Sequence, residues 1–199
     1  MQIFLSPAAI SGQYNSIISL GDNMPAFKGL PSISGDSISS TDVNEEIIVL
    51  VSLANHCPWV RGMDKDLVKL SQLFSEDSVR IIGFSVNHRE DDRLPAMIEH
   101  AKKVGYTFDY VYDESQQLGR ALGATRTPEY FVFNKDRVLV YMGGLYDSPA
   151  KMNNENSIRH INGEPQEFYV QNAIRATLSG INFNPKETRA HGCSVKYVQ

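Results

Sequence analysis

The sequence predicts an α/β fold in which layers of helices cover both faces of one mixed sheet. Apolar, β-branched runs alternate with segments whose apolar residues recur at helical spacing, which is typical of parallel strands joined by helices. The last two predicted strands are separated by a short polar turn, so they should form an antiparallel hairpin. We therefore expect the element order β-α-β-α-β-α-β-β-α around a central mixed sheet.

The length and composition fit one globular domain. The 199 residues are 42% hydrophobic and 21% charged, enough for one full core. We expect a single domain over residues 1–199, with an N-terminal extension, a core at about 21–180 and a C-terminal tail at 181–199. The net charge of −4 comes without a basic cluster, so we expect neither a nucleic acid nor a membrane as partner. The opening MQIFLSPAAI lacks the basic start of a secretory signal, and we expect a cytoplasmic protein.

The first half of the chain is predicted to contain a turn-rich entry at 32–44, two strands and two helices. Residues 47–53 are a continuous apolar run, typical of a central strand buried on both faces. Pro58 fits the first turn of the next helix, because a first-turn amide has no helical partner to lose. Residues 79–86 form the second strand, and a helix over 94–104 ends at Gly105. The polar loop at 87–93 is expected to be a solvated surface.

The second half continues with a strand at 106–112 and a short helix at 115–122. Pro128 is incompatible with a central strand, so it should mark the start of the strand at 129–134, in a tight turn where a cis bond is common. That strand and the one at 138–142 form the hairpin. Residues 148–166 are polar and rich in asparagine, and we expect an exposed loop or lid there. The last helix begins near Phe168 and ends at Gly180.

Cys57 lies in the loop between the central strand and the helix that Pro58 begins. Unpaired N–H groups and the dipole at a helix N-terminus favour a thiolate, which makes Cys57 a candidate nucleophile. A free cysteine also commonly just fills a core. Cys193, in the tail, is the second of two cysteines, too few for a disulfide scaffold.

Four segments carry a family resemblance: ANHCPWV, YDESQQLGRALGATRTPEYFVF, YMGGLYDS and GCSVKY. Together they resemble the alkyl hydroperoxide reductase and thiol-specific antioxidant branch of the thioredoxin-like superfamily, in the redoxin group with a CNHCP motif. The resemblance covers residues 21–197 and implies a thioredoxin-like three-layer fold and thiol chemistry at Cys57, without a cofactor. It also implies a set of active-site neighbours: Ala54, Asn55, His56, Pro58, Trp59, Arg126, Thr127 and Pro128.

The chain departs from that family at Ala54, where the motif has a cysteine. Cys-x-x-Cys has become Ala-x-x-Cys, so the usual attacking thiol is missing. The peroxiredoxin pattern places its peroxidatic cysteine at Cys57, but it expects a threonine and a proline where this chain has Ala54 and Leu50. Neither signature is therefore complete.

One hypothesis makes the tail an arm that folds back, so that Cys193 attacks an oxidised Cys57. The substrate would be a small-molecule peroxide or a protein disulfide, and an external thiol would reduce the resulting disulfide. His56 and Trp59 would line the entrance, and Arg126 would help to hold the thiolate. A homodimer is compatible with this hypothesis.

Two other classes of function remain open from the sequence. A zinc site could use His56, Cys57, His191 and Cys193, although adjacent residues are awkward as two tetrahedral ligands; we rank it low and predict no metal. Alternatively, the chain is a redox-inactive module that binds proteins through a groove beside Pro128. Ala54 is the strongest argument for that module, and the two retained cysteines argue against it.

Overall fold

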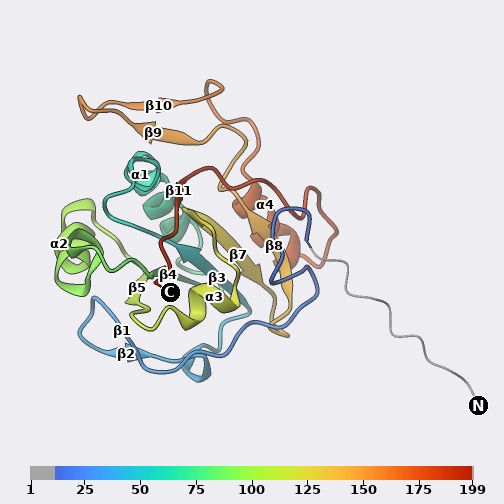
Figure 1. The fold of residues 1–199 in the computed structure, drawn as a ribbon. Coiled ribbons are helices and arrows are strands. Elements are labelled where there is room, and N and C mark those ends of the chain that lie inside the picture. The colour runs from blue at the N-terminus through green and yellow to red at the C-terminus, as the bar shows by residue number, and fades with distance from the viewer. Residues whose placement is uncertain (1–11, 199) are drawn as a thin grey trace, which may run out of the picture.

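A five-stranded mixed sheet lies at the centre of the structure, a computed structural model that describes residues 12–198 (Figure 1). Its strands, in spatial order, are β5 (Asp109–Tyr112), β4 (Val79–Ser85), β3 (Ile47–Ser52), β7 (Glu129–Phe133) and β8 (Leu139–Gly143). The first three run parallel to one another, whereas β7 pairs antiparallel with both β3 and β8. The predicted mixed sheet, with a central strand beginning at Ile47, is confirmed. The opening segment, for which we expect no secretory signal, lies outside the described residues.

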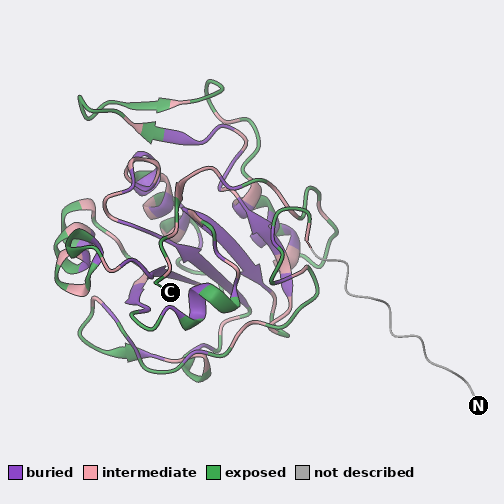
Figure 2. Ribbon diagram, in the orientation of Figure 1, coloured by how far each residue is buried: buried purple, intermediate pink, exposed green. Residues whose placement is uncertain are grey.

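Helices cover both faces of this sheet, as predicted. Side chains of α1 (Pro58–Leu73), α2 (Leu94–Val104) and α4 (Tyr169–Leu178) enter the core on one face. Short α3 (Gln117–Ala121) joins the N-terminal segments in the core on the other face. Figure 2 shows the sheet buried between these layers. Gly105 ends α2 in the left-handed conformation, with φ of 84°, as the sequence predicts.

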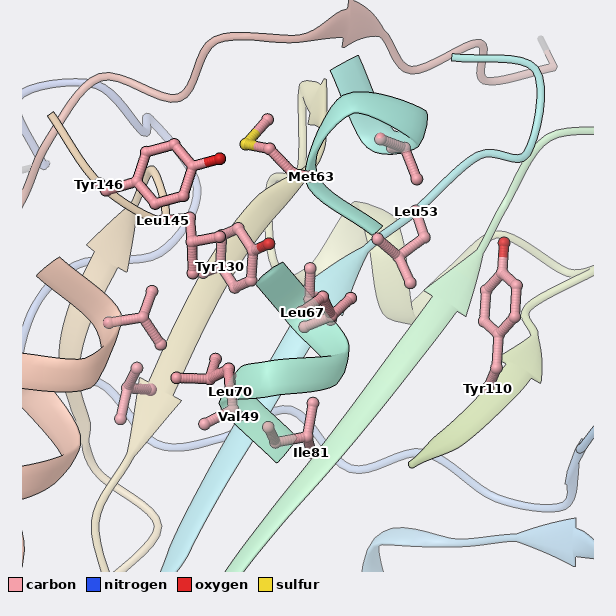
Figure 3. Close-up of a cluster of buried hydrophobic side chains, with 14 of the residues drawn as sticks. Val49, Leu53, Met63, Leu67, Leu70, Ile81, Tyr110, Tyr130, Leu145 and Tyr146 are labelled. Atoms are coloured by element: carbon pink, nitrogen blue, oxygen red, sulfur yellow. The ribbon is translucent and has the colours of Figure 1, made fainter. Parts of the chain in front are cut away.

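Helix α1 is fixed on the sheet by one apolar face. Met63, Leu67 and Leu70 recur at helical spacing and are buried against sheet residues such as Val49 and Ile81 (Figure 3). All six residues of β3 are buried, because the strand is covered on both faces. The N-terminus of α1 is therefore held at the carboxyl end of the central strand.

Two predicted segments differ in detail. The turn-rich entry forms a small hairpin of β1 (Leu30–Pro31) and β2 (Ser37–Ile38), followed by a 3₁₀ turn at Ser40–Asp42. The strand predicted at 106–112 begins only at Asp109. Tyr106 and Phe108 instead pack ring against ring, with centroids 4.5 Å apart, in the core beside α1. Aromatic packing therefore replaces strand pairing there.

The prediction of an irregular loop or lid at 148–166 is wrong. Two strands, β9 (Ala150–Met152) and β10 (Ile158–His160), form an antiparallel hairpin that lies beside α1 (Figure 1). The asparagine-rich residues are its turn: the side-chain oxygen of Asn153 accepts hydrogen bonds from the amides of Glu155 and Ser157. The strands are short and mostly exposed, so no apolar alternation marked them in the sequence.

The C-terminal tail returns to the centre of the molecule. Its last strand, β11 (Cys193–Ser194), is labelled in Figure 1. It pairs antiparallel with β6 (Arg126–Thr127). Among the helices within residues 12–198, none combines the length and the apolar character needed to cross a bilayer.

Candidate active site

Cys57 is the residue that immediately precedes helix α1. Its amide donates to the carbonyl of Ala54 at 3.0 Å, which closes a tight turn between the central strand and the helix. The side chain is fully buried, and its Sγ donates a hydrogen bond to the carbonyl oxygen of Thr127 at 3.0 Å. The position at the helix N-terminus is the one that the sequence predicts.

The partner carbonyl belongs to a rigid loop. The Thr127–Pro128 peptide bond is cis, and Glu129 lies directly after it. The Glu129 carboxylate accepts hydrogen bonds from the amides of Thr125 and Arg126, at 2.7 and 3.0 Å. Burial raises the pKa of the Glu129 carboxyl, while these two hydrogen bonds oppose the increase. The loop thus holds the Thr127 carbonyl in place above Cys57.

The tail brings the second cysteine to the same loop. Cys193 lies directly opposite Thr127 in the β6–β11 pair, and Ser194 lies opposite Arg126. Cys193 is half-buried, and both cysteines are free thiols. Two cysteines that are far apart in the sequence therefore meet at Thr127.

The strand that carries Cys193 is docked rather than extended as an arm. Gln116 is fully buried, and its side-chain amide donates to the carbonyl of Lys196 at 3.1 Å. The oxygen of the same side chain accepts from the amide of Val198 at 2.8 Å. Tyr197 adds a hydrogen bond from its hydroxyl to the carbonyl of Ala124 at 2.7 Å. These contacts fix the tail just beyond Cys193, and the sequence carried no signal for them.

The surroundings of Cys193 keep its thiol protonated at neutral pH. Burial, followed by the hydrogen bond and the charge of Cys57, raises the pKa of Cys193 to about 12. The positive charge of Lys151 lowers it, by a smaller amount. Because Cys57 is one cause of the increase, the two thiols are close enough to interact.

A buried carboxylate orients the loop before Cys57. Asp92 is fully buried, and it contacts His56 through both oxygens: one lies 2.5 Å from Nδ1 of the ring, and the other accepts from the backbone amide at 3.2 Å. The neighbouring Asn55 donates to the carbonyl of Asp91 at 2.8 Å. The expectation that residues 87–93 form a solvated surface is therefore wrong at Asp92. The sequence did hold a signal for this contact. Asp92 follows β4 and Cys57 follows β3, and these neighbouring parallel strands end at the same edge of the sheet.

Trp59 and Arg126, both predicted to lie near the thiol, make contacts with different parts of the chain. The Trp59 ring lies 6.4 Å from the ring of His191, and the ammonium of Lys151 lies 5.5 Å from its centroid. The guanidinium of Arg126 donates to the hydroxyl of Ser194 at 2.5 Å. The described structure records no hydrogen bond from Arg126 to a thiol, so its contact is with the tail and not with the predicted thiolate.

The four donors of the zinc hypothesis do not form a cluster. Within residues 12–198, the one group of three or more potential ligand atoms within 4.8 Å comprises His56, Asp91 and Asp92. That group contains neither cysteine. The geometry of the described residues therefore does not support a zinc site built on the two sulfurs.

Comparisons with known proteins identify the family and the fold of the chain. The sequence profile of the Redoxin family matches residues 19–158. An uncharacterized conserved protein from Geobacillus kaustophilus is 29% identical, with 92% of this chain and 95% of that chain covered and a TM-score of 0.78. A hypothetical protein from Sinorhizobium meliloti 1021 is 24% identical, with coverages of 91% and 96% and a TM-score of 0.79.

More distant structures share the fold alone. The thioredoxin domain of a thiol-disulfide oxidoreductase from Bacteroides vulgatus is 19% identical, with 63% of this chain and 88% of that chain covered and a TM-score of 0.54. No curated protein matches the chain. The narrower alkyl hydroperoxide reductase branch stays a prediction, but the family match covers more than half of the chain. The chain therefore belongs to the Redoxin family and has a thioredoxin-like fold.

Proposed function

We propose that this protein is a thiol-dependent oxidoreductase in which Cys57 reacts with a small oxidant of the peroxide class and Cys193 resolves the product. Membership of the Redoxin family implies thiol redox substrates in general. One observation carries the more specific proposal: Cys193 lies opposite Thr127, whose carbonyl accepts the hydrogen bond from the Cys57 thiol. The tail thus supplies a second thiol in place of the one that is missing from the motif, where Ala54 replaces a cysteine.

In the first step, the Cys57 thiolate attacks one oxygen of the peroxide. A sulfur–oxygen bond forms, the oxygen–oxygen bond breaks, and the second oxygen leaves as an alcohol or water after taking up a proton. Cys57 immediately precedes α1, so the sulfur that attacks lies at a helix N-terminus. Complete burial of Cys57 favours a small oxidant. The disulfide of another protein is attached to a bulky chain, which could not approach a sulfur that has no exposed surface.

In the second step, Cys193 attacks the sulfenic acid of Cys57. The disulfide forms, the sulfenic oxygen leaves as water, and the Cys193 proton is transferred to it. Because the pKa of Cys193 is raised, its sulfur enters this step as a thiol and must lose its proton as it attacks; the departing sulfenic oxygen is the group that takes up that proton. Because the tail is already docked, little chain movement is required.

Reduction by an external thiol should begin at Cys193. Cys193 is half-buried, whereas Cys57 is fully buried, so the outside thiol reaches the Cys193 sulfur first. Attack there forms a mixed disulfide between the external thiol and Cys193 and expels the Cys57 sulfur as a thiolate. A second external thiol then frees Cys193 and is itself oxidised to a disulfide.

The redox-inactive binding module has less support. That hypothesis needs a free groove beside Pro128, but the edge of β6 next to Pro128 is paired with the tail. Ala54 is fully buried beneath the site, so it would not offer a contact surface to a partner protein.

The test is intact mass and non-reducing peptide mapping of the reduced protein, before and after one equivalent of hydrogen peroxide. The expected product has lost two hydrogens and yields a linked Cys57–Cys193 peptide. Cys193→Ser should stop at an oxygen adduct on Cys57, and Cys57→Ser should stay unmodified. If both thiols of the natural protein stay free, the oxidoreductase proposal is wrong and the binding module becomes the better explanation.

A further inference from the structure

Two cations face each other on the β9–β10 hairpin. Lys151 and Arg159 are direct partners in the antiparallel register, so their side chains lie on the same face. Both are exposed, and within residues 12–198 neither has an acidic group within ion-pair distance. Like charges directly opposite each other destabilise a strand pair. A bound anion would remove that repulsion.

This pair of cations lies beside the thiols. The ammonium of Lys151 is 5.5 Å from the centroid of the Trp59 ring, and Trp59 is the second residue after Cys57. The charge of Lys151 also acts on Cys193. The hairpin is seated firmly on α1: a Cβ atom added to Gly62 would lie 2.6 Å from the carbonyl oxygen of Ala150. The cations are thus held near the site and do not hang on a free loop.

A groove of about 1080 Å³ joins the cations to the start of α1. Pro58, the residue after Cys57, lines it together with Lys151 and Arg159. Ile161 adds exposed apolar surface, with 46% of the residue accessible. Ile158 also lines the groove, but it pairs with Met152 and therefore lies on the opposite face of the hairpin from the two cations. Two acids also line it: Glu155 in the turn at the tip of the hairpin, and Glu164 beyond β10. The groove therefore combines a cationic pair with an apolar flank.

We propose that this groove binds a small aliphatic molecule that carries a carboxylate, with the carboxylate between Lys151 and Arg159. The alkyl part would lie along Ile161, and the reactive end would point toward Pro58, the residue that follows Cys57. Two reactants share this chemistry: a hydroperoxide of an aliphatic acid, which Cys57 would reduce to the hydroxy acid, and a carboxylate-bearing thiol, which would attack the disulfide at Cys193. The reactive half of the proposal rests on the proposed function, whereas the binding half does not.

Binding can be measured without any reaction, because Trp59 is the single tryptophan of the chain. Octanoate should change the tryptophan fluorescence in a saturable way, and octanamide, its neutral counterpart, should not. Calorimetry of octanoate binding gives a second measure that does not depend on the environment of Trp59. The double variant Lys151→Gln, Arg159→Gln should weaken binding at least tenfold. The matched control Lys102→Gln, Arg175→Gln removes the same charge from exposed sites on α2 and α4 and should bind as the natural protein does.

Rate measurements then distinguish the two reactants. The carboxylate-bearing hydroperoxide is compared with a neutral hydroperoxide of equal length, and 3-mercaptopropionate is compared with 2-mercaptoethanol as reductant of the oxidised protein. In at least one of these two comparisons, we expect the carboxylate-bearing reagent to react much faster than its neutral counterpart. The double variant should lower this ratio of rates about tenfold. The comparison in which the ratio falls identifies the oxidant or the reductant as the ligand.

The outcomes separate this proposal from the proposed function. Octanoate binding that depends on the two cations, without any thiol oxidation by peroxides, would support the site and overturn the oxidoreductase. Rapid oxidation with no octanoate binding, and with equal rates for charged and neutral probes, would overturn the site and leave the oxidoreductase standing.

Discussion

The backbone of Gly192 runs so close to Thr127 that a Cβ atom at position 192 would lie 2.2 Å from the Thr127 carbonyl oxygen. Real Cβ atoms essentially never approach a backbone oxygen so closely, and the loop that carries this oxygen is held by hydrogen bonds from its amides to the buried Glu129 carboxylate. Glycine at 192 is therefore what lets β11 dock beside β6. The residue next to Cys193 controls the approach of its thiol.

Gly192→Ala should displace the tail while leaving both cysteines in the chain. We expect at least a tenfold slower formation of the Cys57–Cys193 disulfide, measured by non-reducing peptide mapping after peroxide treatment. Gly144→Ala is the matched control, because a Cβ atom there would make only ordinary contacts, the closest at 3.4 Å. Equal disulfide rates in the two variants would contradict the proposed role of the docked tail.

Gln116→Leu should loosen the tail from its other side. The carbonyls of Val86 and Lys196 and the amide of Val198 would lose their side-chain partner. A buried polar group without a partner costs roughly 1–3 kcal/mol, and the tail carbonyl and amide can regain water by undocking. We therefore expect faster hydrogen exchange of the Val198 amide and a free energy of unfolding lower by about 1–3 kcal/mol. The exposed neighbour Gln117→Leu should change neither.

Alkylation of Cys193 should depend steeply on pH. Only the thiolate is alkylated, and the pKa of Cys193 is raised to about 12, so the rate should still rise about tenfold per pH unit at pH 10, where an ordinary cysteine has reached its plateau. Cys57→Ala removes the hydrogen bond and the charge of Cys57 but leaves most of the burial, so the pKa of Cys193 should fall part of the way. Iodoacetamide kinetics followed by mass spectrometry measure both effects. A plateau below pH 10 in the natural protein would show that the two thiols do not interact.

Asp92→Asn should release the ring of His56. The substitution keeps the size of the side chain but replaces one of its two acceptor oxygens by an NH2 group, and a buried polar group left without its partner costs roughly 1–3 kcal/mol. We expect a loss of that order in urea unfolding, together with a shift of the His56 ring resonances. Asp91→Asn is the control: Asp91 is exposed, and its removal should change stability by less than about 0.5 kcal/mol. Equal effects of the two variants would mean that the contact with His56 contributes no stability.

Local patterns carried most of the fold. The buried run that begins at Ile47 and the proline at position 58 each specify their own element, and together they place Cys57 correctly at the start of a helix. Pro128 likewise marks the start of its strand, and its peptide bond is cis as the tight turn suggested. These predictions succeed because each depends on neighbours within a few residues.

The rest of the site depends on contacts between distant segments. Asp92 looked like one more charge in a solvated loop, but the 3₁₀ turn at Glu90–Asp92 directs it at His56. The exposed strands of the hairpin that carries Lys151 lacked any periodic pattern. The contact between the tail and Cys57 was one hypothesis among several. The strand that docks the tail is only two residues long, and so short a strand leaves no periodic pattern in a sequence. Nothing in the sequence around Gln116, the buried residue just before α3, indicated that its side chain holds that tail.

The docked tail also links oxidation to the stability of the whole chain. A disulfide within a Cys-x-x-Cys motif closes a loop of a few residues and restricts the unfolded chain very little. A bond from residue 57 to residue 193 would instead tie the first helix to the last strand and close a loop of most of the chain. By the chain-entropy relation, such a closure stabilises the folded state by about 5 kcal/mol. The oxidised protein would therefore be more stable at equilibrium than the reduced one, and the redox state of one thiol pair would set the balance between the folded and unfolded chain.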